Sequence, residues 1–139
     1  MINYYNNLNL KNKLAYVIGG FGLLGKETSY ALAYCGAKVL ILDVKKDQNF
    51  LNKIIKNNLE VKYCSFNLKN ILNLEKKYSS ILSKYNTPSI FVNCSYPKTA
   101  DWHKNNFKNI KFSSFKKNIE FQLISNAWIT FMTAQSMKK

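Results

Sequence analysis

Three glycines stand three residues apart directly after an apolar run, at Gly19, Gly22 and Gly25 in the stretch AYVIGGFGLLGKE. A glycine-rich turn between a strand and a helix lets the backbone approach a pyrophosphate, and the free N–H groups at the helix start point at the anion. Gly19 is expected to make the tight turn, Gly22 to allow the close approach, and Gly25 to allow close packing of helix on strand. The spacing therefore predicts a phosphate-binding turn.

A carboxylate follows this turn at a distance that suits a ribose. Asp43 ends a second apolar run, KVLILD, 18 residues after Gly25. An acidic residue there can accept hydrogen bonds from both hydroxyls of an adenosine ribose, and it would repel a 2′-phosphate. NAD is thus favoured over NADP, although Lys45 and Lys46 lie close enough to weaken that preference. The alternative is that the glycines only make a tight turn and that Asp43 only caps a helix.

These residues need a framework to position them, and the hydrophobic pattern supplies one of alternating strands and helices. Gly36 is expected to end the first helix. Strands are predicted at 14–18, 38–43, 59–66 and 89–93, with helices at about 22–34, 47–57, 71–85 and 115–137. This alternation predicts an α/β fold, a doubly wound (Rossmann-type) parallel sheet that stops after the fourth strand and the following long helix. We expect one domain over residues 1–139, with a polar leader at 1–12.

Spacing also predicts which side chains of the helices face the core. The candidates are Phe50, Leu51, Ile54 and Ile55 in the second helix and Leu72, Leu74, Tyr78, Ile81 and Leu82 in the third. The last helix is apolar around much of its circumference, through Phe121, Leu123, Ile124, Ala127, Trp128, Ile129, Phe131 and Met132. Its apolar surface exceeds what one face of a four-stranded sheet can cover.

The composition of the chain limits the classes of partner that are expected. The formal charge is +14, yet all 21 basic residues are lysines and they are scattered along the chain, which indicates a solvated lysine surface and no nucleic acid or membrane partner. Cys35, Cys64 and Cys94 are odd in number and far apart, so neither a disulfide framework nor a metal site is expected. A reduced, cytoplasmic compartment fits this cysteine usage.

The residues above resemble the N-terminal half of the short-chain dehydrogenase/reductase family over nearly the whole chain. The family's nucleotide motif is similar to IGGFGLLG, with Ile18 where the family commonly has Thr. Asn67, in FNLKN, stands where the family has an Asp that contacts adenine, and VNCSYP resembles the family's Asn-Asn-Ala-Gly motif with Asn93 kept. SYPKTADW and FQLISNAW resemble the subgroup that acts on sugar precursors of surface and flagellar glycans.

The glycine turn, Asp43 and this resemblance together imply an NAD-binding site. Its predicted residues are Gly19, Phe21, Gly22, Leu23, Leu24, Gly25, Asp43, Asn67, Leu68, Asn93, Cys94 and Ser95.

The catalytic residues that the resemblance implies are largely missing. In the family a Ser follows the fifth strand, and a Tyr and a Lys four residues apart on the next helix transfer the proton. Tyr34 and Lys38 have that spacing, but Gly36 is expected to break the helix between them. The family's helix amide falls on Gln122, with Asn118 and Asn126 as neighbouring candidates. The lone His103 is interpreted as a solvated loop residue.

The resemblance therefore implies an NAD(P)-binding oxidoreductase of the short-chain type, as an N-terminal half that lacks the catalytic Tyr and Lys and is inactive in isolation. A non-catalytic nucleotide-binding or regulatory module and an inactive truncation product remain alternatives. The apolar fourth strand would become a sheet edge, since the family's strand order places a fifth strand beside it. Self-association, or a second polypeptide that carries the catalytic half, is expected to cover these surfaces.

Overall fold

The structure is a computed structural model that describes residues 8–138. The chain divides into two compact units, which are described separately. The first unit runs up to Phe66 and includes Asn86–Ser95, and the second comprises Asn67–Tyr85 and the chain from Tyr96 onward. The first seven residues of the predicted leader lie outside the described residues.

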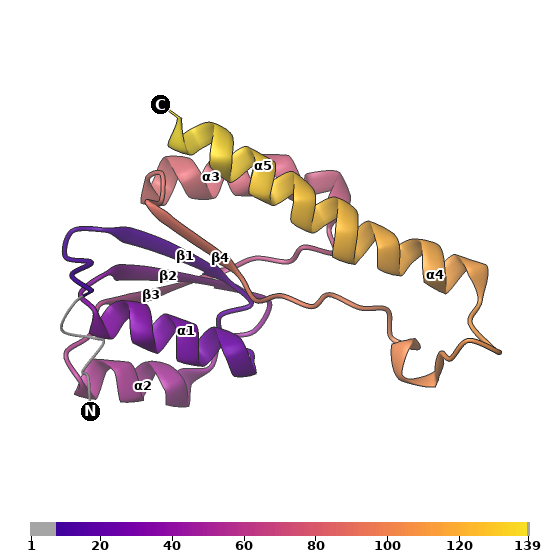
Figure 1. The fold of residues 1–139 in the computed structure, drawn as a ribbon, viewed down its shortest axis with the longest axis horizontal. Coiled ribbons are helices and arrows are strands. Elements are labelled where there is room, and N and C mark those ends of the chain that lie inside the picture. The colour runs from indigo at the N-terminus through magenta and orange to yellow at the C-terminus, as the bar shows by residue number, and fades with distance from the viewer. Residues whose placement is uncertain (1–7, 139) are drawn as a thin grey trace. The chain divides into compact units, whose positions relative to one another are not determined.

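The first unit is built on a parallel sheet of four strands, β1 (Leu14–Ile18), β2 (Lys38–Asp43), β3 (Val61–Ser65) and β4 (Ile90–Asn93). Their order is β3-β2-β1-β4, so the chain moves outward from β1 in one direction and then returns to its other side (Figure 1). Such a reversal leaves a crevice at the carboxyl ends of the strands. The predicted Rossmann-type α/β fold is confirmed.

Two helices of the first unit, α1 (Leu23–Tyr34) and α2 (Gln48–Lys56), lie on one face of this sheet (Figure 1). Gly36 adopts a φ of +97° just after α1, as predicted for a residue that ends a helix. Lys38 is therefore the first residue of β2, and Tyr34 and Lys38 share no helix. Asp47 caps α2, because its Oδ1 accepts the Phe50 N–H at 2.9 Å.

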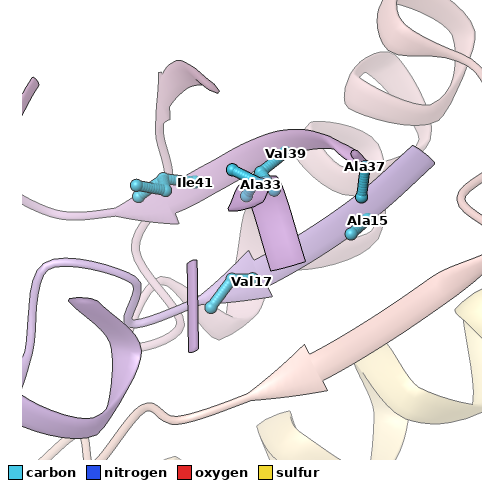
Figure 2. Packing of buried hydrophobic residues seen from close by; sticks show 6 residues of the cluster. All are labelled: Ala15, Val17, Ala33, Ala37, Val39 and Ile41. Carbon is cyan, nitrogen blue, oxygen red and sulfur yellow. The ribbon is translucent and has the colours of Figure 1, made fainter. Parts of the chain in front are cut away.

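Small side chains let α1 approach the sheet closely. The core cluster consists of Ala15, Val17, Ala33, Ala37, Val39 and Ile41, all at most 3% exposed (Figure 2). On α2, Leu51 and Ile54 are buried as predicted. Ile55 is 66% exposed, so its predicted core position is wrong. Successive residues of a helix are rotated by about 100°, so the side chain of Ile55 points away from the buried side on which Ile54 lies.

The second unit consists of helices joined by irregular segments. A 3₁₀ turn (Ile71–Asn73) leads into α3 (Leu74–Tyr85), and a second one lies at Trp102–Lys104. The last helix begins at Phe112, three residues earlier than predicted, and comprises α4 (Phe112–Ile119), a π-helical turn (Glu120–Ile124) and α5 (Ser125–Met137). Leu72 is 98% exposed, so its predicted core position is wrong, because it lies in the 3₁₀ turn and off the α3 spacing.

A buried hydrogen bond joins α3 to α5 within the second unit. The Thr133 hydroxyl donates to the Ile129 carbonyl at 2.7 Å, so the Tyr78 hydroxyl, 2.6 Å from Thr133 Oγ1, acts as the donor to it. Tyr78 and Ile129 are fully buried, which also corrects the prediction that Ile129 adds to bare apolar surface. Burial raises the pKa of Tyr78 to about 12.

This buried phenol predicts an alkaline loss of stability. The ordinary pKa of 10.0 applies in the unfolded chain, so the neutral phenol favours the folded state fully below pH 10, and this contribution is lost as the pH rises through 12. Tyr78→Phe is expected to be about 1 kcal/mol less stable at pH 8 and to lack this alkaline loss. Urea unfolding across this pH range measures both effects.

Tyr85→Phe is the matched control, since no hydrogen bond is recorded for the Tyr85 hydroxyl in the described part of the chain. The control should lose stability with pH as the parent does. A gap between the parent and Tyr78→Phe that stays constant from pH 8 to about pH 12 would contradict the assignment.

Candidate functional site

The turn after β1 is closed by backbone contacts. Gly19 adopts a φ of +70°, and its carbonyl accepts the Gly22 N–H at 3.0 Å. The Gly19 N–H donates in turn to the Leu42 carbonyl of β2 at 2.8 Å. The predicted tight turn therefore exists, and it is tied to the neighbouring strand.

Three of the four glycines in this turn are required by packing. A Cβ on Gly19 would lie 2.8 Å from Ser95 Cα, and a Cβ on Gly20 would lie 2.8 Å from the Ile41 side chain. A Cβ on Gly25 would overlap the Gly19 carbonyl oxygen and lie 2.7 Å from Gly20 Cα. The first turn of α1 thus packs directly on the backbone of the glycine turn, a closer contact than the predicted packing of helix on strand.

Gly22 differs from the others because its backbone conformation does not need a glycine and an added Cβ would meet a single atom, which must yield slightly. Its φ of −71° and ψ of 175° suit any residue, and the nearest neighbour of an added Cβ is the Gly19 carbonyl oxygen at 3.3 Å. No other heavy atom outside its chain neighbours lies within 4 Å of that position. The missing side chain at Gly22 therefore leaves open space at the start of α1.

Unused N–H groups border this space. Gly22 is the N-cap of α1, and no side chain caps the helix. The first intrahelical bond runs from the Lys26 N–H to the Gly22 carbonyl, so the N–H groups of Leu23, Leu24 and Gly25 precede it. The first turn also contains no acidic residue. Helix ends of this kind bind anions, because several N–H dipoles point the same way.

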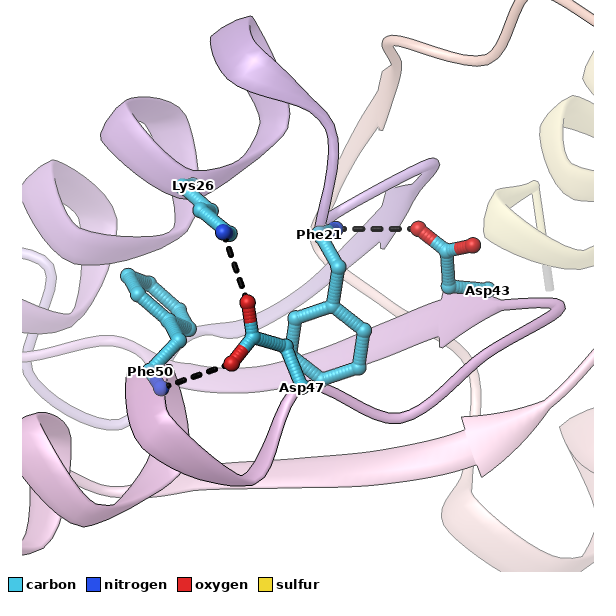
Figure 3. Close-up of polar contacts among 5 residues, drawn as sticks. All are labelled: Phe21, Lys26, Asp43, Asp47 and Phe50. Atoms are coloured by element: carbon cyan, nitrogen blue, oxygen red, sulfur yellow. Dashed lines mark hydrogen bonds and ion pairs between the residues drawn. The ribbon is translucent and has the colours of Figure 1, made fainter.

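Asp43 lies beside the same turn. Its Oδ2 accepts the Phe21 N–H at 2.9 Å (Figure 3). Its Oδ1 accepts the Val44 N–H at 2.7 Å. These two bonds fix the carboxylate plane, while each oxygen keeps a second lone pair for another donor. Asp43 therefore does not cap α2, a role that belongs to Asp47.

The aromatic ring of Phe21 anchors the amide that holds Asp43. It lies edge-on to Phe50 at 6.1 Å and 5.4 Å from the Tyr63 ring, measured between centroids. The Lys26 ammonium lies 2.6 Å from Asp47 Oδ2 (Figure 3). The hydrogen bonds from Lys26 and the Phe50 amide hold the pKa of Asp47 below its usual value. α1 and α2 are thus linked next to the glycine turn.

The end of β4 meets the glycine turn inside the same unit. Asn93 Oδ1 accepts both the Ser95 N–H at 3.0 Å and the Ser95 hydroxyl. The Cys94 N–H donates to the Ile18 carbonyl, and its sulfur lies 3.9 Å from Thr28 Oγ1 on α1 and packs against the core cluster. The side chain of Cys94 is therefore occupied by packing, and its N–H is occupied by the hydrogen bond to β1.

Other predicted site residues belong to the second unit and are described by their own surroundings. Asn67 is exposed, and its Oδ1 accepts the Lys69 N–H at 3.0 Å, whereas Leu68 is 4% exposed. His103 is exposed in a short 3₁₀ turn. The contacts of Asn67 and Leu68 with a cofactor remain predictions, as does the interpretation of His103 as a solvated loop residue.

Gln122 differs from the two neighbouring amides. It lies in the π-helical turn, a feature that often occurs at functional sites, and its Nε2 is buried with no hydrogen-bond partner in the described part of the chain. Asn118 is 4% exposed and donates to Thr99 Oγ1 and the Ser114 carbonyl. Asn126 donates to the Gln122 carbonyl at 2.7 Å. An extra residue in a helical turn has no signature in side-chain type, so the sequence could not predict it.

Residues 8–138 contain no group of three metal-ligating side chains, and their three cysteines are free. No helix among these residues is long and apolar enough to cross a bilayer.

Comparison with solved structures shows which folds this chain resembles. A 3-oxoacyl (acyl-carrier-protein) reductase from Agrobacterium tumefaciens with NADP bound matches 98% of this chain at 14% identity, with a TM-score of 0.81. A protein assigned as a D-mannonate oxidoreductase from Haemophilus influenza with NAD bound matches 97% at 19% identity, with a TM-score of 0.78. A Serratia marcescens short-chain dehydrogenase/reductase variant matches 92% at 17% identity, with a TM-score of 0.76.

The fold is shared with these proteins. The chain spans about half of their lengths, 52% to 54%. No family model matches its sequence, and no curated protein does. One of these neighbours is recorded with NAD and another with NADP, so the likeness does not separate the two cofactors.

The contrast between Gly25 and Gly22 predicts very unequal losses of stability from the same substitution to alanine. Gly25→Ala should destabilise the chain by several kcal/mol, because its methyl group would overlap the Gly19 carbonyl. Gly22→Ala should change stability by less than about 1 kcal/mol, since its backbone suits alanine. Chemical unfolding of the two variants measures both values, and equal losses would contradict the geometry of the turn.

Proposed function

We propose that this chain is the dinucleotide-binding part of an NAD(P)-dependent oxidoreductase of the short-chain dehydrogenase/reductase type. The observation that carries the proposal is the Asp43 carboxylate, held by the Phe21 N–H of the glycine turn, next to the open space at Gly22. A pyrophosphate fits the uncapped N–H groups of α1, and a ribose fits the carboxylate one strand away. The shared fold and the sequence resemblance support the same assignment.

The bound dinucleotide would supply hydride transfer at its nicotinamide, and the chain's own residues would bind and orient it. The N–H groups of Leu23, Leu24 and Gly25 would donate to the phosphate oxygens, and Asp43 would accept from the ribose hydroxyls. Asn67 and Leu68 are proposed to contact the adenine. The backbone at Asn93, Cys94 and Ser95 would line the carboxyl end of β4.

NAD is proposed as the preferred cofactor. Both oxygens of Asp43 are fixed by backbone N–H groups, so the carboxylate cannot turn away from a 2′-phosphate without breaking a hydrogen bond. Two like charges at such close range repel each other. Lys45 and Lys46 are exposed and form no ion pair within residues 8–138. Their charges could attract a 2′-phosphate, so weaker binding of NADP is also expected.

Gln122 is proposed to take part in proton transfer, because its buried Nε2 has no partner in the described residues. The Tyr and Lys that the family uses are not supplied by Tyr34 and Lys38, which lie on different elements. We propose that catalysis requires groups from beyond these 139 residues, on the same or another polypeptide. A sugar precursor is proposed as the substrate. The support for it is the resemblance of SYPKTADW and FQLISNAW to the subgroup that acts on glycan precursors.

Calorimetry tests the cofactor site. The parent chain should bind NAD more tightly than NADP, and Gly22→Val should abolish NAD binding with little loss of stability, because its side chain fills the open space. Asp43→Asn should bring the NAD and NADP affinities closer, since the repulsion is removed. Ser80→Val, on the exposed side of α3, is the control for an added valine outside the turn and should bind as the parent does.

Three results would separate the alternatives. Equal NAD affinity of Gly22→Val and the parent would mean that the site is wrongly assigned. Sustained NADH production by the purified chain, unchanged in Tyr34→Phe, would contradict the proposed need for further catalytic groups. NAD binding by the chain, combined with no NADH production when a polypeptide carrying the Tyr and Lys is added, would favour the regulatory module.

Self-association is proposed for the apolar side of the last helix. Phe115, Leu123, Ile124, Trp128 and Phe131 are each 43% to 61% exposed. Within residues 8–138, β4 is paired only with β1 and thus forms an edge of the sheet. Exposed large apolar side chains and an open strand edge are each usually covered in an assembly.

Leu123→Lys should reduce this association, because Leu123 is 61% exposed and a charge there must be desolvated on contact. Trp128→Lys should do the same, and it also removes the hydrogen bond from Trp128 Nε1 to Glu75. Asn49→Lys adds the same charge to the exposed side of α2 and should leave association unchanged. Sedimentation velocity would contradict the proposal if the parent were a monomer at concentrations of roughly 100 μM.

A further inference from the structure

The second unit contains a pocket that the proposed function does not use. Its volume is about 510 Å³, and it lies between α4, the π-helical turn and two loops of the same unit. Three lysines line it, Lys69, Lys98 and Lys117, together with Ser113, Phe121 and a single carboxylate, that of Asp101. None of the three lysines forms an ion pair among the described residues. The lining therefore carries a net charge of about +2.

A buried polar network fixes the wall of this pocket. Ser114 and Asn118, on α4, are 5% and 4% exposed. The Thr99 N–H donates to Asn118 Oδ1 at 3.1 Å, and the Ser114 hydroxyl donates to Asp101 Oδ1 at 2.9 Å. The loop that carries Lys98 is thus held on the helix that carries Lys117.

The position of Lys69 brings its charge into the pocket. Its ammonium donates to the Lys98 carbonyl at 3.2 Å and lies 5.9 Å from the centre of the Phe121 ring. Both partners line the pocket. The Lys69 ammonium retains further donor hydrogens for a ligand. The Ser113 hydroxyl, which has no recorded hydrogen bond in residues 8–138, adds another donor.

We infer that this pocket binds a phosphate monoester of a small organic molecule. A phosphate monoester carries close to two negative charges near neutral pH, which matches the net charge of the lining. The volume lies in the range of small-molecule sites and exceeds what a single phosphate group needs, so the organic part has room against Phe121. Lysine ammonium groups are common phosphate ligands in proteins. This inference does not depend on the proposed function.

Calorimetry with phenyl phosphate tests the inference, with phenol as the uncharged probe. The full chain carrying Gly22→Val is used as the reference, so that the glycine turn does not contribute. Phenyl phosphate should bind, and phenol should bind at least about tenfold more weakly, because it lacks the charge. Binding should weaken as salt is raised, since exposed charges are screened.

Lys117→Gln and Lys69→Gln should each weaken phenyl phosphate binding about tenfold. Lys116→Gln is the matched control, because Lys116 is the exposed neighbour of Lys117 on α4 and does not line the pocket. Equal weakening by Lys116→Gln and Lys117→Gln would overturn the inference. No binding of phenyl phosphate up to roughly 10 mM, or equal binding of phenol, would also overturn it.

Discussion

The contact between the first turn of α1 and the backbone of the glycine turn is the constraint on which the rest of the first unit depends. Any side chain at Gly25 would overlap the Gly19 carbonyl, so the helix can start there only if that side chain is absent. This contact fixes the direction of α1, and thereby the N–H groups that precede its first hydrogen bond. It also places the Phe21 N–H against Asp43 at the end of the next strand. The anion site and the carboxylate thus follow from one backbone contact.

The strands and the first two helices could be predicted from the sequence because their signals are local. β1 and β2 were predicted at their observed bounds, and Gly36 ended α1 as expected. β3 and β4 are shorter than predicted, and residues just outside their bounds, such as Phe66 and Ser89, still donate hydrogen bonds to the neighbouring strand, so a sequence pattern does not show where the regular ladder ends. Ile55 and Leu72 were misassigned to the core, because spacing alone does not fix where the buried stripe of a short helix begins or ends.

The interactions that arrange the candidate site could be predicted less well. The sequence predicted that the glycines and Asp43 belong to the site. It did not predict how the glycines differ, because that depends on which atoms an added Cβ would contact in the folded chain. The hydrogen bond from Phe21 to Asp43 joins residues 22 positions apart and leaves no local pattern. The lysine pocket of the second unit combines segments near residues 69, 98 and 117, and in the sequence these lysines are indistinguishable from the scattered others.

The most direct test of this account is an amide NMR titration of the chain with ADP-ribose, which contains the adenosine, the pyrophosphate and both riboses without a nicotinamide. The account predicts that the largest shift changes fall on the N–H groups of Leu23, Leu24 and Gly25 and on those of Phe21 and Val44, which hold Asp43. Binding that leaves these five amides unchanged, or no binding at roughly 5 mM ligand, would contradict the assignment of the glycine turn as a dinucleotide site.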